Sequence, residues 1–158
     1  MEPIKSTSIT ITPERPDTPD AIALIEELET YLQPLSPPEA QFGFSIEKLI
    51  AEAVPFFVTR VDGFPAGCGG VKLFGTEYGE LKRMYVRPSY RGLGLGKLMI
   101  THLEDFARQR GVRLIRLETG NHQDEAIGLY ERMGFQRIPA FGDYRASPFN
   151  LFYEKPVA

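Results

Sequence analysis

Short runs in which apolar and polar residues alternate recur along the chain, and this period of two is typical of β-strands with one buried face. In residues 6–12, which read S-T-S-I-T-I-T, Ile9 and Ile11 share one face. Further strands are predicted at 55–61, 66–74, 80–86, 112–118, 135–138 and 148–155. Asp62 followed by Gly63 is a hairpin signal, and 75–79 forms a second turn, so 55–86 is expected to fold as an antiparallel meander.

Apolar residues at helical spacing indicate four helices between and before these strands. They are predicted at 21–32, 45–52, 95–110 and 124–132. Thr18 or Asp20 can cap the first helix, and Gly111 and Gly134 are expected to end the last two. The inward face predicted for the third helix consists of Leu95, Leu98, Met99, Leu103 and Phe106.

The order of these elements favours an α/β mixed (α+β) fold, with one sheet of six or seven strands and about four helices on its faces. The length of 158 residues is that of one ordinary domain, so we expect a single domain over 1–158. A hydrophobic share of 42% and a charged share of 25% are ordinary for a globular chain and exclude disorder throughout.

Charge and targeting signals narrow the class of protein further. A formal net charge of −3 argues against a dedicated nucleic-acid binder, which carries a basic face. No apolar run is long enough to cross a membrane, and the first residues lack the pattern of a signal peptide. One cysteine, Cys68, cannot form an internal disulfide, so we expect a cytoplasmic protein. Two distant histidines and one cysteine provide no metal-site spacing.

The most informative segment is 86–97, V-R-P-S-Y-R-G-L-G-L-G-K, which lies between a predicted strand and a predicted helix. Its glycines let backbone N–H groups approach a ligand, and the helix that follows adds free N–H groups and a positive dipole end. These features predict a phosphate or pyrophosphate site. The spacing fails for a Walker A loop, and it fits a dinucleotide fingerprint poorly, although Glu118 lies where a ribose-binding acid is expected. Binding of NAD therefore stays a minor alternative.

Two segments of the chain resemble the GNAT superfamily of acyl-CoA-dependent N-acetyltransferases. The residues R-G-L-G-L-G at 91–96 match its [RQ]-x-x-G-x-[GA] signature, and 125–135, E-A-I-G-L-Y-E-R-M-G-F, matches its A-x-x-L-Y-x-x-x-G-F segment. The resemblance is specific over 55–135, because the two segments lie in register with the predicted elements. It implies a GNAT-like sheet that is mostly antiparallel and splayed between the fourth and fifth strands.

The resemblance also implies acetyl-CoA as cosubstrate and assigns residues to it. Backbone groups of the glycine loop would hold the pyrophosphate, and the outer backbone of the fourth strand would run beside the pantetheine arm. The residues so implied are Arg91, Gly92, Gly94, Gly96 and Lys97 for the pyrophosphate, and Met84, Tyr85 and Val86 for the pantetheine. The amide of Met84 or Tyr85 is a candidate donor to the thioester carbonyl.

Acetyl transfer to an amine requires a proton acceptor, because an alkylamine is almost fully protonated at neutral pH. Glu80, at the start of the fourth strand, is the first candidate, and Glu118, at the end of the fifth, is the second. His122 is a third, with a suitable ordinary pKa. For the departing thiolate, the resemblance implies Tyr130 as general acid.

Other features leave alternatives open. Residues 33–43 are either a plain connector or a wall of the substrate site, and 141–148 either shape the acceptor pocket or merely join two strands. Cys68 is predicted to be a buried structural thiol, and His102 a histidine of the helix face without a chemical role. Asn121 lies five residues before Ala126, whereas many family members place an asparagine three residues before that alanine.

The sequence thus predicts an N-acetyltransferase that moves an acetyl group from acetyl-CoA to an amine-bearing substrate by direct attack in a ternary complex. No activated nucleophile for a covalent intermediate is evident. A small-molecule acceptor is favoured over a protein, with neither nucleic acid nor membrane as partner and a homodimer as an open possibility. The alternative is a non-catalytic acyl-CoA-binding regulator on the same fold.

Overall fold

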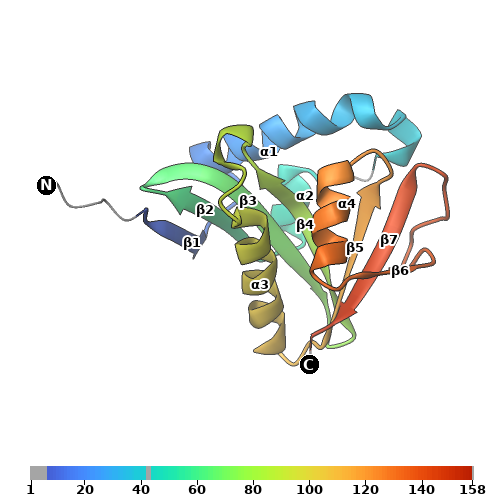
Figure 1. Ribbon diagram of the computed structural model, residues 1–158. Coiled ribbons are helices and arrows are strands. Elements are labelled where there is room, and N and C mark those ends of the chain that lie inside the picture. The colour runs from blue at the N-terminus through green and yellow to red at the C-terminus, as the bar shows by residue number, and fades with distance from the viewer. Residues whose placement is uncertain (1–6, 42–43, 158) are drawn as a thin grey trace, which may run out of the picture.

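The computed structural model describes residues 7–41 and 44–157, so Ser6 of the first predicted strand and residues 42–43 of the loop lie outside the described part. The described chain forms one open, twisted sheet (Figure 1). Its strands are β1 (Ile9–Pro13), β2 (Phe56–Val61), β3 (Phe64–Phe74), β4 (Tyr78–Val86), β5 (Leu114–Gly120), β6 (Gln136–Ile138) and β7 (Asn150–Pro156). Their order in the sheet is β1-β2-β3-β4-β5-β7-β6.

The sheet is antiparallel except at its centre. β1 to β4 form a meander, and β7 pairs antiparallel with both β5 and β6. β4 and β5 run parallel and pair only where Gly79 meets Ile115 and Glu80 meets Arg116. Beyond Glu80 the two strands separate, and this opening is the splay that the sequence predicted (Figure 1). The predicted fold class is confirmed.

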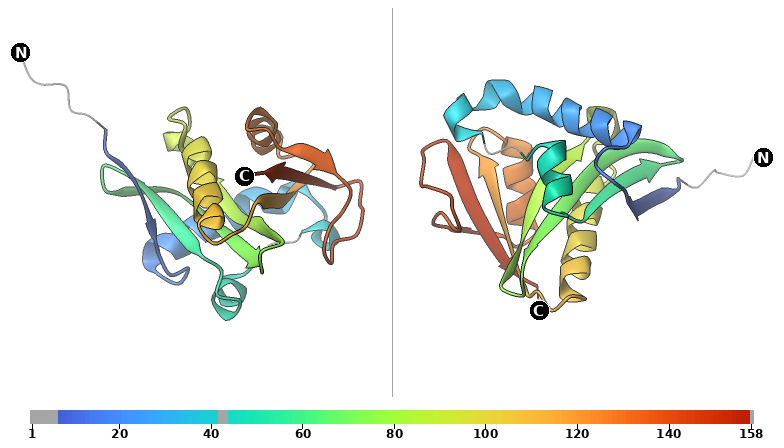
Figure 2. Two further views of the ribbon diagram at one scale, coloured as in Figure 1. Left: turned by 90° about the horizontal axis from the view of Figure 1, so that it is seen from below. Right: turned by 180° about the vertical axis from the view of Figure 1, so that it is seen from behind.

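Helices cover both faces of the sheet. They are α1 (Pro19–Leu32), α2 (Ile46–Ala51), α3 (Leu95–Arg108) and α4 (Asp124–Arg132), with 3-10 turns η1 (Gln33–Leu35), η2 (Pro38–Ala40) and η3 (Pro88–Tyr90). α3 and α4 lie on one face, and α1 and α2 on the other (Figure 2). The larger buried cluster packs under α3 and α4, around Leu103, Ile115 and Tyr153. A second cluster packs under α1 and α2, around Leu24 and Val58.

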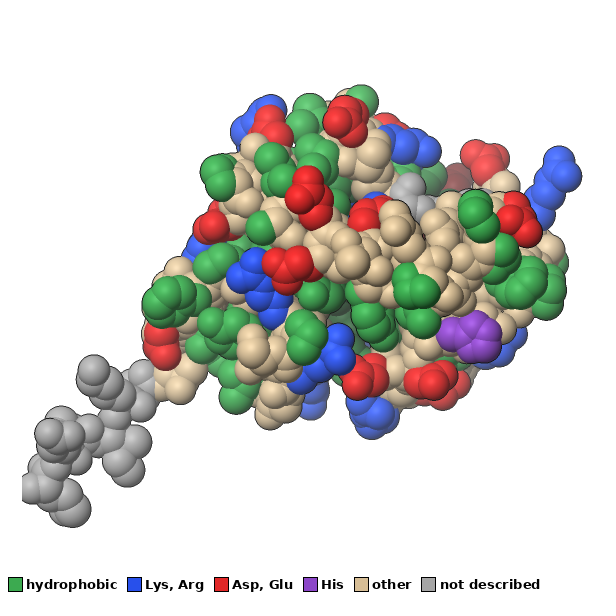
Figure 3. Space-filling model, turned by 90° about the horizontal axis from the view of Figure 1, so that it is seen from above, with side chains coloured by type: hydrophobic (Ala, Val, Ile, Leu, Met, Phe, Trp, Pro, Cys, Tyr) green, Lys and Arg blue, Asp and Glu red, His purple; other side chains and the backbone are tan. Residues whose placement is uncertain are grey.

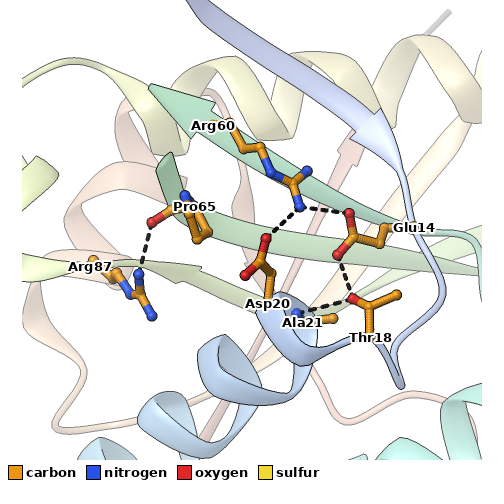
Figure 4. Close-up of polar contacts among 7 residues, drawn as sticks. All are labelled: Glu14, Thr18, Asp20, Ala21, Arg60, Pro65 and Arg87. Carbon is orange, nitrogen blue, oxygen red and sulfur yellow. Dashed lines mark hydrogen bonds and ion pairs between the residues drawn. The ribbon is translucent and has the colours of Figure 1, made fainter. Parts of the chain in front are cut away.

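The start of α1 is fixed to the sheet by polar contacts (Figure 4). The Thr18 hydroxyl accepts a hydrogen bond from the backbone N–H of Ala21, so Thr18 rather than Asp20 is the N-cap of the two that the sequence allowed. Arg60 of β2 donates to both Glu14 and Asp20, at 2.8 Å each. Towards the other end of α1, Glu27 accepts two hydrogen bonds from Arg87, which follows β4, at 2.9 and 2.6 Å. α1 is therefore held above the splayed end of the sheet.

β4 contains a bulge at the point where it leaves β5. Between Lys82 and Tyr85 the pairing with β3 shifts register, and Arg83 adopts a φ of +54°. The glycines of β3 make room for this bulge. A Cβ on Gly67 would lie 2.6 Å from the carbonyl oxygen of Tyr85, and one on Gly69 would lie 2.6 Å from the Met84 sulfur.

Two local predictions are wrong. Leu98 was assigned to the inward face of α3, but its side chain is 43% exposed, because the helix turns this position away from the sheet. Ile9 was placed with Ile11 on the buried face of the first strand, yet Ile9 is 36% exposed because β1 is an edge strand, and only Ile11 packs against the larger cluster. In the described ranges, no helix combines the length and apolarity needed to span a membrane.

Candidate active site

Two cavities meet at the splay between β4 and β5. The larger has a volume of about 480 Å³ and lies against the start of α3, whereas the smaller, of about 110 Å³, lies between α1, the sheet and the loop before β7. Leu28, Met84, Gln123 and Tyr130 line both cavities. A group bound in one cavity can therefore reach a group bound in the other.

The larger cavity is a groove that contains every residue predicted to bind the cosubstrate. These residues are Met84, Tyr85, Val86, Arg91, Gly92, Gly94, Gly96 and Lys97. Gly94 is the N-cap of α3 with a φ of +75°, a conformation that favours glycine, so the loop turns directly into the helix. The first N–H groups of α3 have no partner within the helix, and they make its start a ready anion site.

Charged side chains surround this helix start. Arg91, Lys97 and Arg132 line the groove together with Glu125. Arg91 lies 3.0 Å from the Glu125 carboxylate, and its guanidinium is 5.9 Å from the centre of the Tyr31 ring. Because this ion pair is exposed, it contributes little free energy, so Arg91 can leave Glu125 and pair with a phosphate instead. Sequence reasoning missed Arg132 and Tyr31, which only the packing of α4 and α1 brings to the groove.

Glu118 of β5 lies in the smaller cavity. One carboxylate oxygen, Oε1, accepts a hydrogen bond of 2.7 Å from the Asn150 side-chain amide of β7. Burial raises the pKa of Glu118 to about 7, against the opposing effects of the Asn150 hydrogen bond and the Lys82 charge. A carboxylate with such a pKa can accept a proton near neutral pH and release it again.

Glu80, the first candidate base, lies in the same cavity but is held by other groups. Its side chain is almost fully buried, and Oε2 lies 2.8 Å from the Lys82 ammonium. The same oxygen accepts a hydrogen bond of 2.6 Å from the Tyr144 hydroxyl, and Lys82 donates to that hydroxyl at 3.1 Å. Glu80, Lys82 and Tyr144 thus form a closed triangle. The segment 141–148 therefore supplies a wall of this cavity through Tyr144.

A second ion pair, whose guanidinium is buried and whose carboxylate is 38% exposed, lines the cavity next to the first. The Arg83 guanidinium pairs with the Glu29 carboxylate of α1 and donates from Nε to the carbonyl of Phe44 at 2.9 Å. Phe44 and Gln41 line the same cavity, so the loop between α1 and α2 forms part of its wall, as one of the two readings of 33–43 predicted. The part of that loop at 42–43 is outside the described residues.

Tyr130 of α4 lies where the two cavities join. Its side chain is 7% exposed and packs against the Phe135 ring, with 5.7 Å between ring centres. Burial first, and then the charge of Glu118, raise the pKa of the Tyr130 hydroxyl, so this group stays protonated over the working pH range. It can donate a hydrogen bond to an anion at the junction.

The remaining candidates lie elsewhere. His122 is exposed and lines neither cavity. Cys68 is buried, donates to the Arg83 carbonyl at 3.3 Å, and has a pKa raised by burial, as expected of a structural thiol. The His102 ring meets the edge of Phe57 at 4.5 Å, and Asn121 donates to the Pro148 carbonyl. Among the described residues, no cluster of three or more His, Cys, Asp or Glu is placed to hold a metal ion.

Lys82 and Asn150 are residues of the smaller cavity that sequence reasoning missed. Lys82 stands two residues after Glu80 on the same strand, so the period of two could have placed both on one face. Asn150 carries no such signal, because only the pairing of β7 with β5 brings it to Glu118. Its amide also donates to the carbonyl of Ala40 at 2.9 Å.

A mixed sheet that opens beside a glycine loop, with an acid and a tyrosine at the junction of two cavities, defines a class of acyl-transfer proteins. The family model of the acetyltransferase (GNAT) family matches residues 20–135. The chain belongs to the GNAT family of acetyltransferases and is an acyltransferase.

Relatives of similar length support the same assignment. A protein named IAA acetyltransferase from Azospirillum brasilense is 39% identical over 152 residues, covering 95% of this chain and 99% of its own length. The uncharacterized N-acetyltransferase YsnE of Bacillus subtilis (strain 168) is 32% identical, with 86% and 91% covered. These names indicate acetyl transfer in general.

Solved structures share the fold. The crystal structure of a candidate acyl-CoA N-acyltransferase from Klebsiella pneumoniae is 36% identical, with a TM-score of 0.81 and coverage of 95% of this chain and 98% of the other. A GNAT family acetyltransferase from Elizabethkingia anophelis with acetyl-CoA bound is 16% identical, with a TM-score of 0.70 and coverage of 94% and 97%. At that identity the likeness shows the fold alone.

Proposed function

We propose that this enzyme transfers the acetyl group of acetyl-CoA to the amine of a small acceptor by direct attack in a ternary complex. The observation that carries the proposal is the junction of two cavities at the splay of β4 and β5. The groove suits the cosubstrate, and the smaller cavity holds a carboxylate with a pKa of about 7. The thioester and the amine would meet between Met84 and Tyr130.

The groove has the chemistry that coenzyme A needs. Backbone N–H groups of the loop 91–96 and the start of α3 would hold the pyrophosphate, assisted by Arg91 and Lys97. The outer edge of β4 at Met84, Tyr85 and Val86 would follow the pantetheine arm in the manner of an added strand. That edge is free of β5 beyond Glu80.

Glu118 is the proposed proton acceptor, and Glu80 the second candidate. An ammonium in the smaller cavity would pair with the Glu118 carboxylate, which takes its proton and leaves a neutral amine as nucleophile. Glu80 is less suited, because its Oε2 is already paired with the Lys82 ammonium and accepts a hydrogen bond from Tyr144. We assign Glu80 the role of holding those two side chains in place.

Attack of the amine nitrogen on the thioester carbon places negative charge on the carbonyl oxygen. The backbone amide of Met84 or Tyr85, beside the bulge of β4, is the proposed donor to that oxygen. The nitrogen of this intermediate carries one proton more than the amide product. As the carbon–sulfur bond breaks and the thiolate of coenzyme A departs, that proton leaves the nitrogen and replaces the one that the thiolate takes from Tyr130. Glu118 afterwards releases its own proton to solvent.

Tyr130 is the proposed hydrogen-bond donor and acid for the departing thiolate. The charge of Glu118 is one of the two causes that raise the pKa of Tyr130. Once Glu118 has taken the proton of the amine, that charge is gone, and the hydroxyl becomes a stronger acid at the step where the thiolate leaves. Proton uptake at Glu118 and proton donation by Tyr130 are therefore coupled.

Direct transfer requires no covalent acyl-enzyme. The thiol of Cys68 lines neither cavity, and burial keeps it protonated. The proposal places both substrates on the enzyme together, so initial-rate kinetics should show intersecting rather than parallel lines in double-reciprocal plots.

The proposal is tested by binding and turnover together. Acetyl-CoA and coenzyme A in excess should raise the unfolding temperature by several degrees, whereas NAD should not. Addition of a primary amine should then release free thiol. A variant with Glu80→Gln, Glu118→Gln and Tyr130→Phe should keep the thermal shift and lose the turnover. Binding of acetyl-CoA without thiol release for any amine would instead favour the non-catalytic regulator, and a shift with NAD alone would favour the dinucleotide alternative.

A cytoplasmic location and a homodimer are the remaining parts of the proposal. The buried single thiol of Cys68 is compatible with a reducing compartment. Sedimentation equilibrium at two protein concentrations would test the dimer, which predicts twice the chain mass of 17.8 kDa.

A further inference from the structure

The charges that line the smaller cavity almost cancel. Its described lining contains three acids and two bases. Lys82 is paired with Glu80, and Arg83 is paired with Glu29. The remaining acid, Glu118, receives its hydrogen bond from the neutral amide of Asn150. Among the residues that the structure describes, the carboxylate of Glu118 thus forms no ion pair.

Cations around the cavity do not change this balance. Two of them are themselves paired with acids, Lys72 with Glu52 and Arg116 with Glu154. The ammonium of Lys48 lies 4.6 Å from the centre of the Phe44 ring, but Lys48 is exposed, so salt and water screen its charge. On the surface seen from above, acidic and basic side chains are interspersed, so no large field of one sign is added from that side (Figure 3).

We propose that the acceptor is a small amine whose amino group is its only charge near the reacting end, and that amines with a neighbouring carboxylate, α-amino acids above all, are rejected. The inference rests on the proposed function and names the substrate class of that same site. The volume of about 110 Å³ suits an amine of few atoms, or the amine end of a longer molecule, since pockets for drug-sized ligands begin at ~300 Å³.

The rejection follows from where the charges of an amino acid would lie. With its ammonium at Glu118, its carboxylate is two bonds from the nitrogen and remains inside the same small cavity. There it faces the charge of Glu118, while the two nearby cations already belong to Glu80 and Glu29. A buried site discriminates strongly against a ligand that brings an unpaired charge, because burial removes the water that stabilised the ligand's carboxylate in solution.

Matched acceptors test this inference on the unmodified enzyme. Phenethylamine, phenylalanine and phenylalaninol share one side chain, and ethylamine, alanine and alaninol form a second set. The amino alcohol keeps the bulk at the α-carbon without the charge, so it separates crowding from electrostatics. We expect kcat/KM for thiol release to be at least tenfold higher for the amine and the amino alcohol than for the amino acid.

The outcomes separate the two proposals. Amino acids that react as fast as their amines, or faster, overturn the inference and leave the transfer reaction standing. An amino alcohol that reacts as slowly as the amino acid also overturns it, because bulk rather than charge is then rejected. Thiol release with none of these acceptors or any other amine, in an enzyme that binds acetyl-CoA, overturns the proposed function and the inference with it.

A charge variant gives an independent test of the same idea. Glu29→Gln leaves the buried Arg83 guanidinium without its acid, so the cavity gains one uncompensated positive charge. The ratio of kcat/KM between amine and amino acid should then fall by about tenfold. Lys48→Gln, which removes an exposed charge, is the matched control and should leave the ratio unchanged. Thermal unfolding shows whether Glu29→Gln is folded. Glu80→Gln, which leaves Lys82 without its acid, is a second variant that should lower the same ratio. A ratio unchanged in both folded variants contradicts the charge argument.

Discussion

Glu118 and Asn150 show how two side chains from different strands define one chemical group. Burial opposes ionisation of the carboxylate, whereas the amide hydrogen bond favours it, and the balance gives a pKa of about 7. The same amide group reaches the Ala40 carbonyl, so it also joins the base to the loop between α1 and α2. Asn150 is thus a positioning residue for the base and for one wall of its cavity.

Asn150→Ala is expected to move the acid limb of the pH–rate profile to higher pH. The lost hydrogen bond had lowered the pKa of Glu118, so the base of the variant stays protonated to a higher pH. Activity should recover as the pH is raised, which general damage to the fold would not allow. Asn150→Asp is the comparison, because its second buried carboxylate raises the pKa of Glu118 by like-charge repulsion. If the acid limb does not move in Asn150→Ala, Asn150 does not control the pKa of the base.

Tyr130→Phe is expected to lower kcat by about 10²-fold or more, because general acid catalysis contributes roughly that much. Within 7–41 and 44–157, no hydrogen bond of this hydroxyl would be lost, and the ring contact with Phe135 is kept. Thermal stability and the affinity for acetyl-CoA should therefore change little. If Tyr130→Phe keeps the full kcat with any acceptor, the thiolate leaves without this donor.

The bulge of β4 is the element that turns a plain sheet into a site. It bends the strand away from β5 and directs Met84 to the junction of the two cavities. The bulge depends on β3, whose glycines at 67 and 69 permit the close approach of Tyr85 and Met84. Glycine inside a strand usually weakens the strand, but here the missing side chains of Gly67 and Gly69 are what allow the bulge to form.

Gly67→Ala is expected to displace the end of β4, since the new methyl carbon would lie 2.6 Å from a backbone oxygen of Tyr85, which cannot rotate away. Overpacking of this kind costs ~1–3 kcal/mol of folding free energy. Acetyl-CoA should bind more weakly, because the displaced segment lines the groove. Calorimetric titration and urea unfolding measure the two effects. Gly75→Ala is the control: its φ of +57° makes the alanine cost stability too, but Gly75 does not line the groove, so the affinity should be kept.

Most elements could be predicted from the sequence because their signals are local. Thr18 caps α1, and the alternation in 80–86 places β4, without reference to the rest of the chain. The glycine loop was predictable for the same reason. Leu98 was misplaced because the helical pattern alone does not say which side of α3 the sheet covers. The bulge at Arg83 has no local signal, since its register is set by contact with β3.

The acceptor side of the site was only partly predictable. Glu80, Glu118 and Tyr130 were named from the sequence, and all three line one cavity. The residues that set their properties lie far away along the chain, as Asn150 does from Glu118 and Tyr144 from Glu80. Such pairs arise from tertiary packing, so one sequence without relatives does not reveal them.

In the proposed reaction, each reactant occupies one of the two cavities at the opening of the sheet. The groove at the start of α3 and the cavity beneath α1 are each lined by residues of α1 and α4, and they meet where β4 and β5 separate. This arrangement places the base in the smaller cavity, where burial raises its pKa. A buried carboxylate carries a cost in stability, and that cost should be measurable in the unfolding of the entire chain.

Glu118→Gln is expected to stabilise the protein at alkaline pH. The pKa of Glu118 is about 7 in the fold against 4.5 for the free side chain, so the folded state binds the proton more tightly. The free energy of unfolding is therefore highest below pH 4.5 and falls as the pH rises towards 7, by roughly 3 kcal/mol for this group. Between pH 5 and pH 8 the wild type should lose about 2–3 kcal/mol more than the variant. Equal losses in urea unfolding would contradict the raised pKa.

The pH–rate profile of Glu118→Gln beside that of the wild type tests the central claim most directly. With one good amine acceptor and saturating acetyl-CoA, wild-type kcat/KM should rise through about pH 7 as Glu118 loses its proton. The variant should be slower by about 10²–10⁴-fold and lack that limb, because it has no base to titrate. A variant that keeps the wild-type rate and the same limb would contradict the account and place the base elsewhere, with Glu80 as the next residue to replace.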